Sequence, residues 1–225
     1  MIPVALPSLQ IAAGTQFGYR SGPPWKRRPK VLVESPDKIS FGPGLHLLVA
    51  PNGSGKTTLM RTLAGLHPAL HGSPIVTGCV HYVSDELRMD HELAPRLLFR
   101  AWFKGEARAF ALQLADTLKL DVRTAIGKHS RGNRQKVLLI IAEVLAAHSG
   151  SSLLLMDEPL SGLDGGTREI VAGLWASSSL LRLVVLHELE SVRHADSLTT
   201  ITQGTLRHTR DCTGSTWTET YHLLR

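Results

Sequence analysis

The sequence has few of the features that define several large classes of protein. Its 225 residues include only two cysteines, Cys79 and Cys212, which argues against a disulfide framework or a cysteine-rich zinc site. So few cysteines also fit a reducing compartment. Neither an internal repeat nor a low-complexity tract is present, which argues against solenoid and fibrous architectures.

Long hydrophobic runs are also missing. The longest apolar run, Val137 to Ala142, ends at Glu143 and is far too short to cross a bilayer. The first ten residues, MIPVALPSLQ, lack the basic and then apolar pattern of a secretion signal. If the protein works at a membrane, we therefore expect another chain to supply the membrane-spanning segments.

The residues that are present have the balance of a globular domain. Hydrophobic residues make up 43% and charged residues 20%, which argues against intrinsic disorder. The net charge of +6 favours an anionic partner such as nucleotide, nucleic acid or lipid headgroups, without choosing among them. A basic cluster at residues 25–30 lies in an N-terminal region, 1–30, of irregular composition. We interpret it as a solvated loop, with a phosphate- or membrane-binding patch as the alternative.

Strand and helix patterns alternate along the rest of the chain. Strand patterns occupy residues 38–41, 45–50, 76–83, 152–157 and 181–186, and two short strands flank the turn at Gln203-Gly204. Helical patterns occupy residues 57–66, with Leu59, Leu63 and Leu66 on one face, and residues 97–103, 107–120 and 165–176. Because buried strands that alternate with helices form parallel sheets covered on both faces, the pattern predicts an α/β fold.

The strongest local signal is the glycine-rich segment APNGSGKT at residues 50–57, between a strand pattern and a helix pattern. It fits the phosphate-binding loop except that alanine replaces the first glycine. Gly53 and Gly55 let successive backbone N–H groups point at an anion beside the helix N-terminus. In this motif Lys56 reaches the β- and γ-phosphates, and the hydroxyl of Thr57 ligates Mg²⁺. The segment predicts a nucleotide-binding protein, and no Asn-Lys-x-Asp motif for guanine is present.

A second signal is the apolar strand LLLMDEP, which ends in Asp157 and Glu158. Carboxylates at a buried strand end are costly unless a cation or proton partner lies beside them. In phosphate-loop enzymes an acid in this place holds Mg²⁺, a role that we expect for Asp157. Glu158 points in another direction and could polarise the water that attacks the γ-phosphate. The alternative is a pair of solvated acids at a strand end.

With three further motifs, the chain resembles the nucleotide-binding subunits of ABC transporters. The motifs follow one another as APNGSGKTT, SRGNRQK, LLLMDEP, SGLD (161–164) and His187 after LRLVVL. The resemblance runs from about Tyr19 to about Arg210. It implies a P-loop NTPase with a RecA-like core, a mostly parallel sheet and an N-terminal antiparallel β portion. We accordingly expect a single domain over residues 1–225, with a helical subdomain inserted at 85–147.

The resemblance implies roles for individual residues. Glu158 would be the catalytic base, His187 would contact the γ-phosphate, and Asp164 would contribute to a dimer contact. Thr57 and Asp157 would bind Mg²⁺. The residues expected to bind ATP in the phosphate loop are Asn52, Gly53, Ser54, Gly55, Lys56, Thr57 and Thr58.

Two positions depart from the family pattern. The nearest candidates for the aromatic residue that stacks on adenine are Phe17 and Tyr19. We expect Tyr19 in this role, with a packed surface aromatic as the alternative interpretation. A family glutamine that serves Mg²⁺ or water falls here on Asp85, whose anionic oxygen suits the metal. With the loop registered one residue differently, Ser84 would face the site instead.

The signature motif departs as well. The usual Leu-Ser-Gly-Gly-Gln corresponds here to residues 129–133. The hydroxyl of Ser130, with the free amides of a helix N-terminus, makes an anion site, Gly132 allows close approach, and Asn133 assists. By resemblance these residues bind the ATP held by a second subunit, whereas the alternative is a plain helix cap. A basic residue such as Arg131 is familiar in exporter-like members, which favours export.

These observations together predict a subunit that binds and hydrolyses ATP with Mg²⁺ and powers a separate membrane-spanning permease. Two such subunits, identical or different, would close head to tail around ATP, at the inner face of the cell membrane and on its cytoplasmic side. One alternative is a soluble ATPase of the same superfamily that acts on nucleic acid or ribosomes. The additional domains usual in those proteins do not fit in this length, so we expect no nucleic-acid partner. Another alternative is a weakly active regulatory subunit. Asp85 and Arg131 argue for it, whereas Glu158 and His187 argue against an inactive site.

Overall fold

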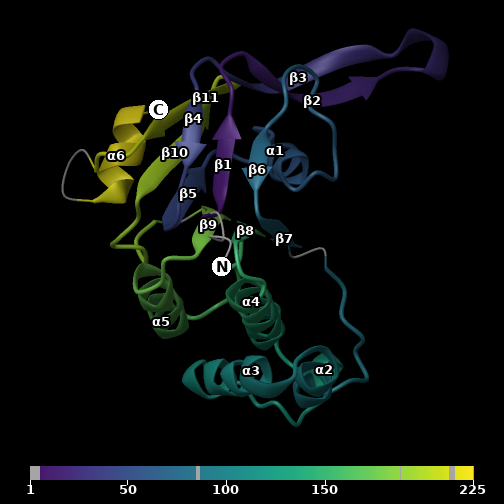
Figure 1. Ribbon diagram of the computed structural model, residues 1–225, viewed down its shortest axis with the longest axis vertical. Coiled ribbons are helices and arrows are strands. Elements are labelled where there is room, and N and C mark those ends of the chain that lie inside the picture. Colours follow the sequence, from purple (N-terminus) through teal and green to yellow (C-terminus); the bar gives the residue numbers. More distant parts are fainter. Residues whose placement is uncertain (1–5, 85–86, 188, 213–215, 225) are drawn as a thin grey trace, which may run out of the picture.

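The computed structural model describes residues 6–84, 87–187, 189–212 and 216–224. In this part of the chain, an eight-stranded sheet lies beside a three-stranded antiparallel sheet (Figure 1). The order in the large sheet is β2 (Thr15–Ser21), β3 (Arg28–Ser35), β11 (Thr205–Thr209), β10 (Ser197–Thr202), β5 (Leu45–Val49), β9 (Leu181–Val185), β8 (Ser152–Asp157) and β7 (Cys79–Ser84). The order in the small sheet is β4 (Ile39–Phe41), β1 (Ser8–Ile11) and β6 (Ile75–Thr77).

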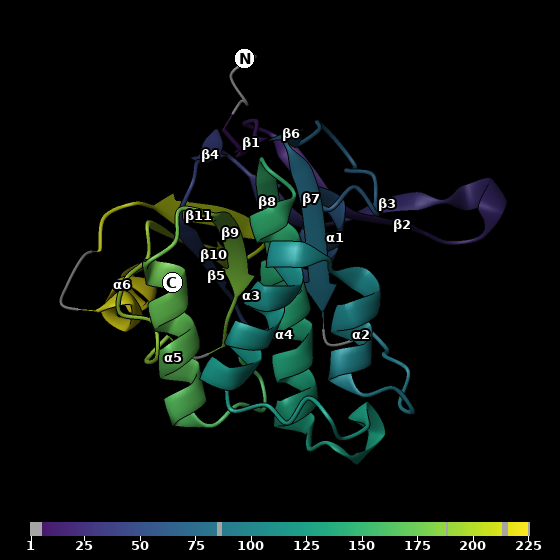
Figure 2. The same ribbon diagram turned by 60° about the horizontal axis from the view of Figure 1, so that its bottom comes forward.

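The strands from β10 to β7 in the large sheet run parallel, whereas β2 pairs with β3, and β10 with β11, in antiparallel fashion. The helices are α1 (Lys56–Leu63), α2 (Pro95–Trp102), α3 (Gly105–Thr117), α4 (Arg131–His148), α5 (Gly165–Ala176) and α6 (Trp217–Leu224). Short 3₁₀ turns lie at Pro24–Lys26 and Ile126–Lys128. In Figure 2, α3, α4 and α5 lie in front of the large sheet, with α2 beside them. The division of residues 85–147 into a separate subdomain stays a prediction.

Among the described residues, the core consists of two hydrophobic clusters, one on each face of the large sheet. Alternate residues of β8 divide between them: Leu154 and Met156 pack with α3, α4 and α5, whereas Leu153 and Leu155 pack with α1 and the small sheet. Since both faces are covered, the central strands are buried throughout their length. This explains why they read as continuous apolar runs in the sequence.

A buried ion pair joins the layers. Arg182 on β9 donates from Nη2 and Nε to the carboxylate of Glu143 on α4, at 2.6 and 3.1 Å. The indole Nε1 of Trp175 on α5 donates to the same carboxylate at 2.8 Å. The side chain of Arg182 is only 2% exposed, and a buried charge is costly unless it is paired. Glu143, from another element, supplies the compensating charge.

Most predicted elements are confirmed. The helix at 165–176 begins and ends as expected, and β10 and β11 flank the turn at Gln203-Gly204. The expected N-terminal antiparallel β portion is confirmed, because β1, β2 and the start of β3 lie within residues 1–30. The basic cluster at 25–30, interpreted as a solvated loop, is exposed to solvent, but its residues 28–30 belong to β3. Leu66 was expected on the buried face of a helix, but α1 ends at Leu63 and Leu66 is 65% exposed.

The strand predicted at 76–83 is interrupted at Gly78, which has φ +102° and separates β6 from β7. A side chain on Gly78 would meet the carbonyl oxygen of Ser151 at 2.6 Å. Helix α6 had no counterpart among the sequence predictions. Within the described ranges, no helix combines the length and apolar character needed to cross a bilayer.

Candidate nucleotide-binding site

The phosphate loop connects the end of β5 to the start of α1. Gly53 and Gly55 have φ values of +77° and +98°, the left-handed backbone that favours glycine. At Gly55 a β-carbon would also lie 2.9 Å from Cγ2 of Val33 and 3.1 Å from Cβ of Leu32, both on β3. The loop is therefore fixed by its own backbone and by packing against a neighbouring strand.

Lys56 opens helix α1 with its side chain folded over the loop. Its Nζ donates to the carbonyl oxygens of Ala50 at 2.8 Å and Pro51 at 3.0 Å, and the residue is 6% exposed. Burial lowers the pKa of Lys56, while the negative charges of Glu158 and Asp157 act in the opposite direction. A buried ammonium group in a glycine-rich loop at the N-terminus of a helix suits a polyphosphate.

Thr57 and Asp157 meet at the edge where the parallel strands end. The hydroxyl of Thr57 donates to Oδ2 of Asp157 at 2.9 Å, and Asp157 is 8% exposed. A hydroxyl and a carboxylate oxygen at this separation form a donor set that fits Mg²⁺, which prefers one or two protein oxygens and keeps the rest of its shell for water and phosphate. When bound, the ion would neutralise charge on the β- and γ-phosphates.

Glu158 and His187 form the other pair at this edge. Glu158 follows β8, His187 lies just beyond β9, and Nε2 of His187 is 2.5 Å from Oε1 of Glu158. Glu158 has φ +54°, an uncommon backbone conformation for a residue other than glycine, and its N–H donates to the carbonyl of Val185 at 3.2 Å. Both side chains remain partly exposed, so they can reach a substrate and a water molecule.

The signature segment lies at the start of α4. Ser130 is the N-cap of this helix, and its hydroxyl accepts a hydrogen bond from the N–H of Asn133 at 3.2 Å. The cap that the sequence predicted is therefore formed. Both Ser130 and the neighbouring Arg131 are exposed, so the cap is open to a partner.

Three contacts that the sequence did not predict join this helix start to residues 159–162, which follow Glu158. A β-carbon on Gly132 would lie 2.6 Å from the carbonyl oxygen of Gly162. Arg131 donates from Nη2 to the hydroxyl of Ser161 at 3.1 Å. Buried Gln135 donates to the carbonyl of Pro159 at 3.0 Å. We call this set of contacts the cap–loop junction.

The remaining predicted residues lie apart from these contacts. Asp164 caps α5, and its carboxylate accepts from the N–H and hydroxyl of Thr167 at 2.9 and 2.7 Å. These hydrogen bonds, that of the hydroxyl first, lower the pKa of Asp164. Tyr19 lies on β2, with Nζ of Lys30 5.6 Å from its ring centroid. Its role as the adenine-stacking residue stays a prediction.

Asp85 lies outside the described residues. Ser84, the alternative ligand at this position, ends β7 and pairs in register with Asp157 on β8. Neighbouring residues of parallel strands in register share a face of the sheet, so Ser84 lies beside the predicted metal ligand.

The fold and this site define a nucleotide-binding P-loop protein, and comparison with known proteins narrows the class. A sequence profile described as ABC transporter matches residues 42–161. The aliphatic sulfonates import ATP-binding protein SsuB of Yersinia pestis bv. Antiqua is 31% identical over 217 residues, which cover 90% of this chain and 75% of that protein. The chain belongs to the ABC transporter family and is an ATP-binding cassette, the ATPase part of such transporters.

Further relatives differ in the direction of transport that their names give. The SsuB protein of Escherichia coli O1:K1 / APEC is 31% identical over 170 residues, which cover 70% of this chain and 66% of that protein. The chain thus spans about two thirds of the length of this relative. The cytochrome c biogenesis ATP-binding export protein CcmA of Mesorhizobium japonicum is 32% identical over 144 residues, which cover 58% and 70% of the two chains.

Solved structures share the fold. A dimeric ATP-binding cassette in a post-hydrolysis state with ADP and Pi has a TM-score of 0.68 at 17% identity, covering 90% of this chain and 98% of that one. A bacterial Atm1-family ABC exporter with ATP bound has a TM-score of 0.70 at 18% identity, covering 92% and 39%.

Proposed function

We propose that this chain hydrolyses ATP with Mg²⁺ and thereby drives a separate membrane-spanning permease at the cytoplasmic face of the cell membrane. The observation that carries the proposal is the convergence of two pairs at one sheet edge. Thr57 and Asp157 form a metal-binding pair, and Glu158 and His187 form a proton-handling pair. A nucleotide-binding protein without turnover would need only the first of these.

The second pair supports a specific division of labour. Glu158 accepts a proton from the attacking water, and His187 orients the carboxylate through its Nε2 contact and reaches the γ-phosphate. Lys56 and the loop amides hold the phosphates in place. Catalysis then rests on positioning and on charge stabilisation, as in other phosphoryl transfers.

The proposed assembly is a head-to-tail dimer with an identical or related subunit. It is supported by the open cap at Ser130, which offers its hydroxyl and helix amides to the ATP of the other subunit. Binding of ATP closes the dimer, and hydrolysis and release reopen it. Outward transport is proposed on the signature variant Arg131 alone, and the curated relatives include both an import and an export protein.

Glu158→Gln tests the function. The amide cannot take up a proton from water, so we expect ATPase activity to fall by about two orders of magnitude or more, while ATP binding persists. The closed dimer should then accumulate with ATP, as seen by light scattering. Phosphate release and nucleotide binding are measured on the purified protein.

The matched control is Glu169→Gln, which removes one exposed carboxylate on α5 and should leave turnover unchanged. Normal phosphate release by Glu158→Gln would remove this residue from the mechanism. Loss of nucleotide binding in the same variant would instead indicate that Glu158 serves binding.

A further inference from the structure

The hairpin of β2 and β3 extends beyond the body of the molecule (Figure 1). Its base is anchored in the core, since Phe17 and Val33 are both fully buried. Antiparallel pairing continues outward as far as Ser21 opposite Arg28. Over residues 19–31, which we call the arm, every side chain that the structure describes is exposed. The arm therefore gains almost no stability from burial within this chain, and a two-stranded ribbon is at best marginally stable alone.

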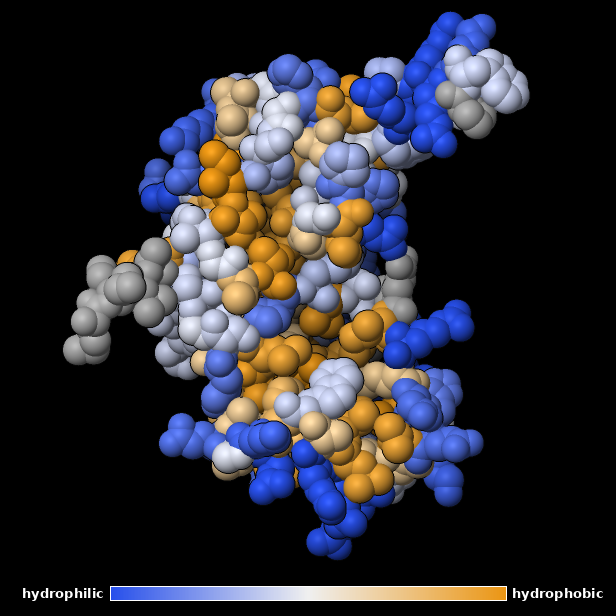
Figure 3. All heavy atoms as spheres, turned by 45° about the vertical axis from the view of Figure 1, so that its right-hand side comes forward, coloured by the Kyte–Doolittle hydropathy of each residue, from blue (hydrophilic) through white to orange (hydrophobic). Residues whose placement is uncertain are grey.

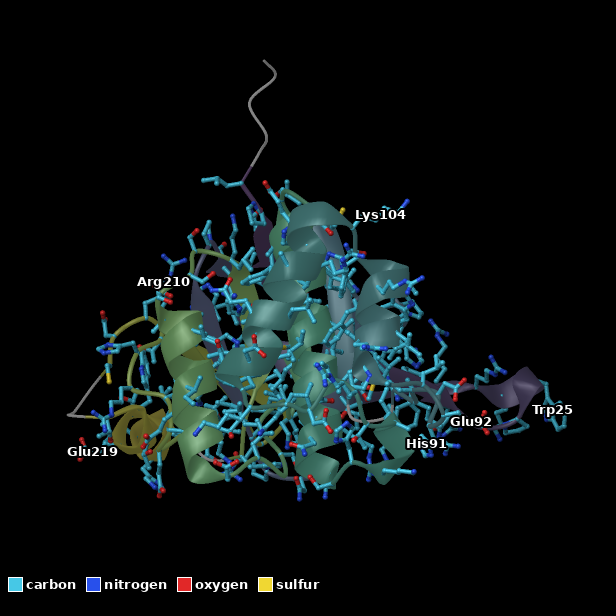
Figure 4. The ribbon with its side chains drawn as sticks, turned by 90° about the horizontal axis from the view of Figure 1, so that it is seen from below. Trp25, His91, Glu92, Lys104, Arg210 and Glu219 are labelled. Carbon is cyan, nitrogen blue, oxygen red and sulfur yellow. The ribbon has the colours of Figure 1, made fainter. Side chains whose placement is uncertain are left out.

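The arm has the charge of a binding surface for anions. It contains no acidic residue, and its five basic residues are Arg20, Lys26, Arg27, Arg28 and Lys30. Hydrophilic side chains accordingly dominate its surface in Figure 3, whereas apolar side chains cover much of the body below it. Trp25 lies at the tip and is 86% exposed (Figure 4). An indole in this position, with cations directly behind it along the ribbon, has no partner within the described chain to explain it.

This arrangement matches the chemistry of a lipid surface. Tryptophan prefers the headgroup level of a membrane, where its apolar ring is buried and its N–H stays hydrated. Clustered basic side chains are attracted to anionic lipids. Nucleic acid would instead need a groove or a stacking platform. The arm is instead a narrow two-stranded projection (Figure 1).

The direction of the arm agrees with this chemistry. The arm and the segment 87–94, which follows β7, both extend to the right-hand side in Figures 1 and 4, and Trp25 lies farther out than His91 and Glu92. The resemblance to ABC transporters assigns the coupling between ATP and the membrane partner to the loop after β7, in which Asp85 lies in the sequence. The comparison of directions rests on the proposed function, whereas the chemistry of the arm does not.

We propose that the arm binds anionic lipid headgroups, with Trp25 inserted at headgroup level and the five basic side chains bound to lipid phosphates. The interaction is peripheral and reversible, because one indole and a basic cluster give only modest membrane affinity. It adds a direct contact between the cassette and the bilayer to the contact that its permease provides.

The test is flotation of the purified chain with vesicles of phosphatidylcholine alone or mixed with phosphatidylglycerol. We expect binding only to the anionic vesicles and weakening as salt rises. Each basic side chain near such a surface strengthens binding about fivefold, so Arg27→Glu with Arg28→Glu should weaken it at least about thirtyfold. Lys104→Glu with Arg108→Glu changes the same charge on exposed residues outside the arm and is the matched control.

A second variant separates the indole from the charge. Trp25→Ala should weaken vesicle binding about tenfold at constant net charge, whereas Trp102→Ala, at another exposed tryptophan, should not. Equal binding to neutral vesicles, or equal loss in the control variants, would overturn the proposal. Binding of a single-stranded oligonucleotide through Arg27 and Arg28, without vesicle binding, would overturn it in favour of nucleic acid.

Failure of this proposal can be told apart from failure of the proposed function. ATPase activity is measured without vesicles, and neither Trp25 nor the two arginines belongs to the nucleotide site. Wild-type protein that binds anionic vesicles without hydrolysing ATP would contradict only the proposed function. Wild-type protein that hydrolyses ATP and ignores vesicles would contradict only the role of the arm.

Discussion

At the scale of single residues, the glycines of the sequence motifs have structural roles that can be stated one by one. Gly55 serves the phosphate loop twice, through a left-handed backbone and through contact with β3. Gly132 lies so close to the carbonyl of Gly162 that a methyl group would force one of the two segments to move. Packing within its own chain therefore requires glycine at position 132, in addition to any approach of ATP from another chain.

Gly132→Ala tests this reason. The added carbon would lie 2.6 Å from the Gly162 oxygen and should displace the helix start or the loop after Glu158. Displacements of about 1 Å can cost on the order of a hundredfold in rate, so we expect ATPase activity to fall by about ten- to a hundredfold. The phosphate loop is not touched, and ATP binding to the isolated subunit should persist.

Gly173→Ala is the control, because a β-carbon at this position on α5 meets no atom within 4 Å. This variant should keep full activity and be slightly more stable, since alanine favours helix over glycine. Wild-type turnover in Gly132→Ala would show that the cap–loop junction adapts without consequence.

At the scale of elements, charge holds α4 and α5 against β9. Glu143→Gln would leave Arg182 buried without a negative partner, and we expect a loss of about 3–5 kcal/mol in the free energy of unfolding, measured with urea. Glu106→Gln, at an exposed position on α3, should change it by less than about 0.5 kcal/mol.

The combined change Glu143→Leu with Arg182→Met separates charge from packing. Apolar side chains of similar volume need no partner, so the pair should recover most of the stability that Glu143→Gln loses. If the double variant is as unstable as the single one, the hydrogen bonds to Trp175 and the backbone matter more than the unpaired charge.

A pair of histidines links β5 and β11 around Phe41. Each ring lies 5.1 Å from the Phe41 ring, His46 pairs with Ser197 at 2.7 Å, and His208 pairs with Thr199 at 3.0 Å. Burial first, and then the proximity of His46 and Arg210, lowers the pKa of His208 to about 4. Burial also lowers the pKa of His46. Both rings therefore favour the neutral form in the folded protein.

This gives a pH dependence with a definite sign. The unfolded chain protonates His208 near pH 6.5, whereas the folded chain does so only near pH 4, so the free energy of unfolding falls as pH drops through this window. Allowing for solvent screening of a half-buried ring, the contribution is on the order of 2 kcal/mol. Urea titrations at several pH values should show a flatter dependence for His208→Asn than for wild type. The exposed control His67→Asn should follow wild type, and parallel curves for all three proteins would contradict the assignment.

At the scale of the whole molecule, the sequence was enough to predict the α/β class and the motifs that follow the central strands. Parallel strands covered on both faces give apolar runs. Asp157 and Glu158 occur at the end of one such run, and Lys56 follows another after the phosphate loop. Sequence patterns indicate local periodicity and backbone requirements, and the nucleotide-site edge of this fold is built from turns that directly follow strands.

The parts that could not be predicted depend on contacts between distant residues. β1 has no strong pattern of its own and forms because β4 and β6 lie on either side of it. The arm has a turn-like composition, but pairing of β2 with β3 makes it an extended ribbon. Likewise, Arg131 and Ser161 are 30 positions apart, and nothing in either segment indicates that their side chains meet.

The cap–loop junction has a consequence for communication in the proposed dimer. Each chain's cap would report on the other chain's nucleotide, while the loop joined to that cap directly follows its own Glu158. Occupancy of one site would thus be transmitted to the proposed general base of the other through the few residues of the cap–loop junction. With two such crossed paths, neither site would hydrolyse ATP at its full rate until both sites have bound ATP. The rate should then rise as the square of ATP concentration at low occupancy.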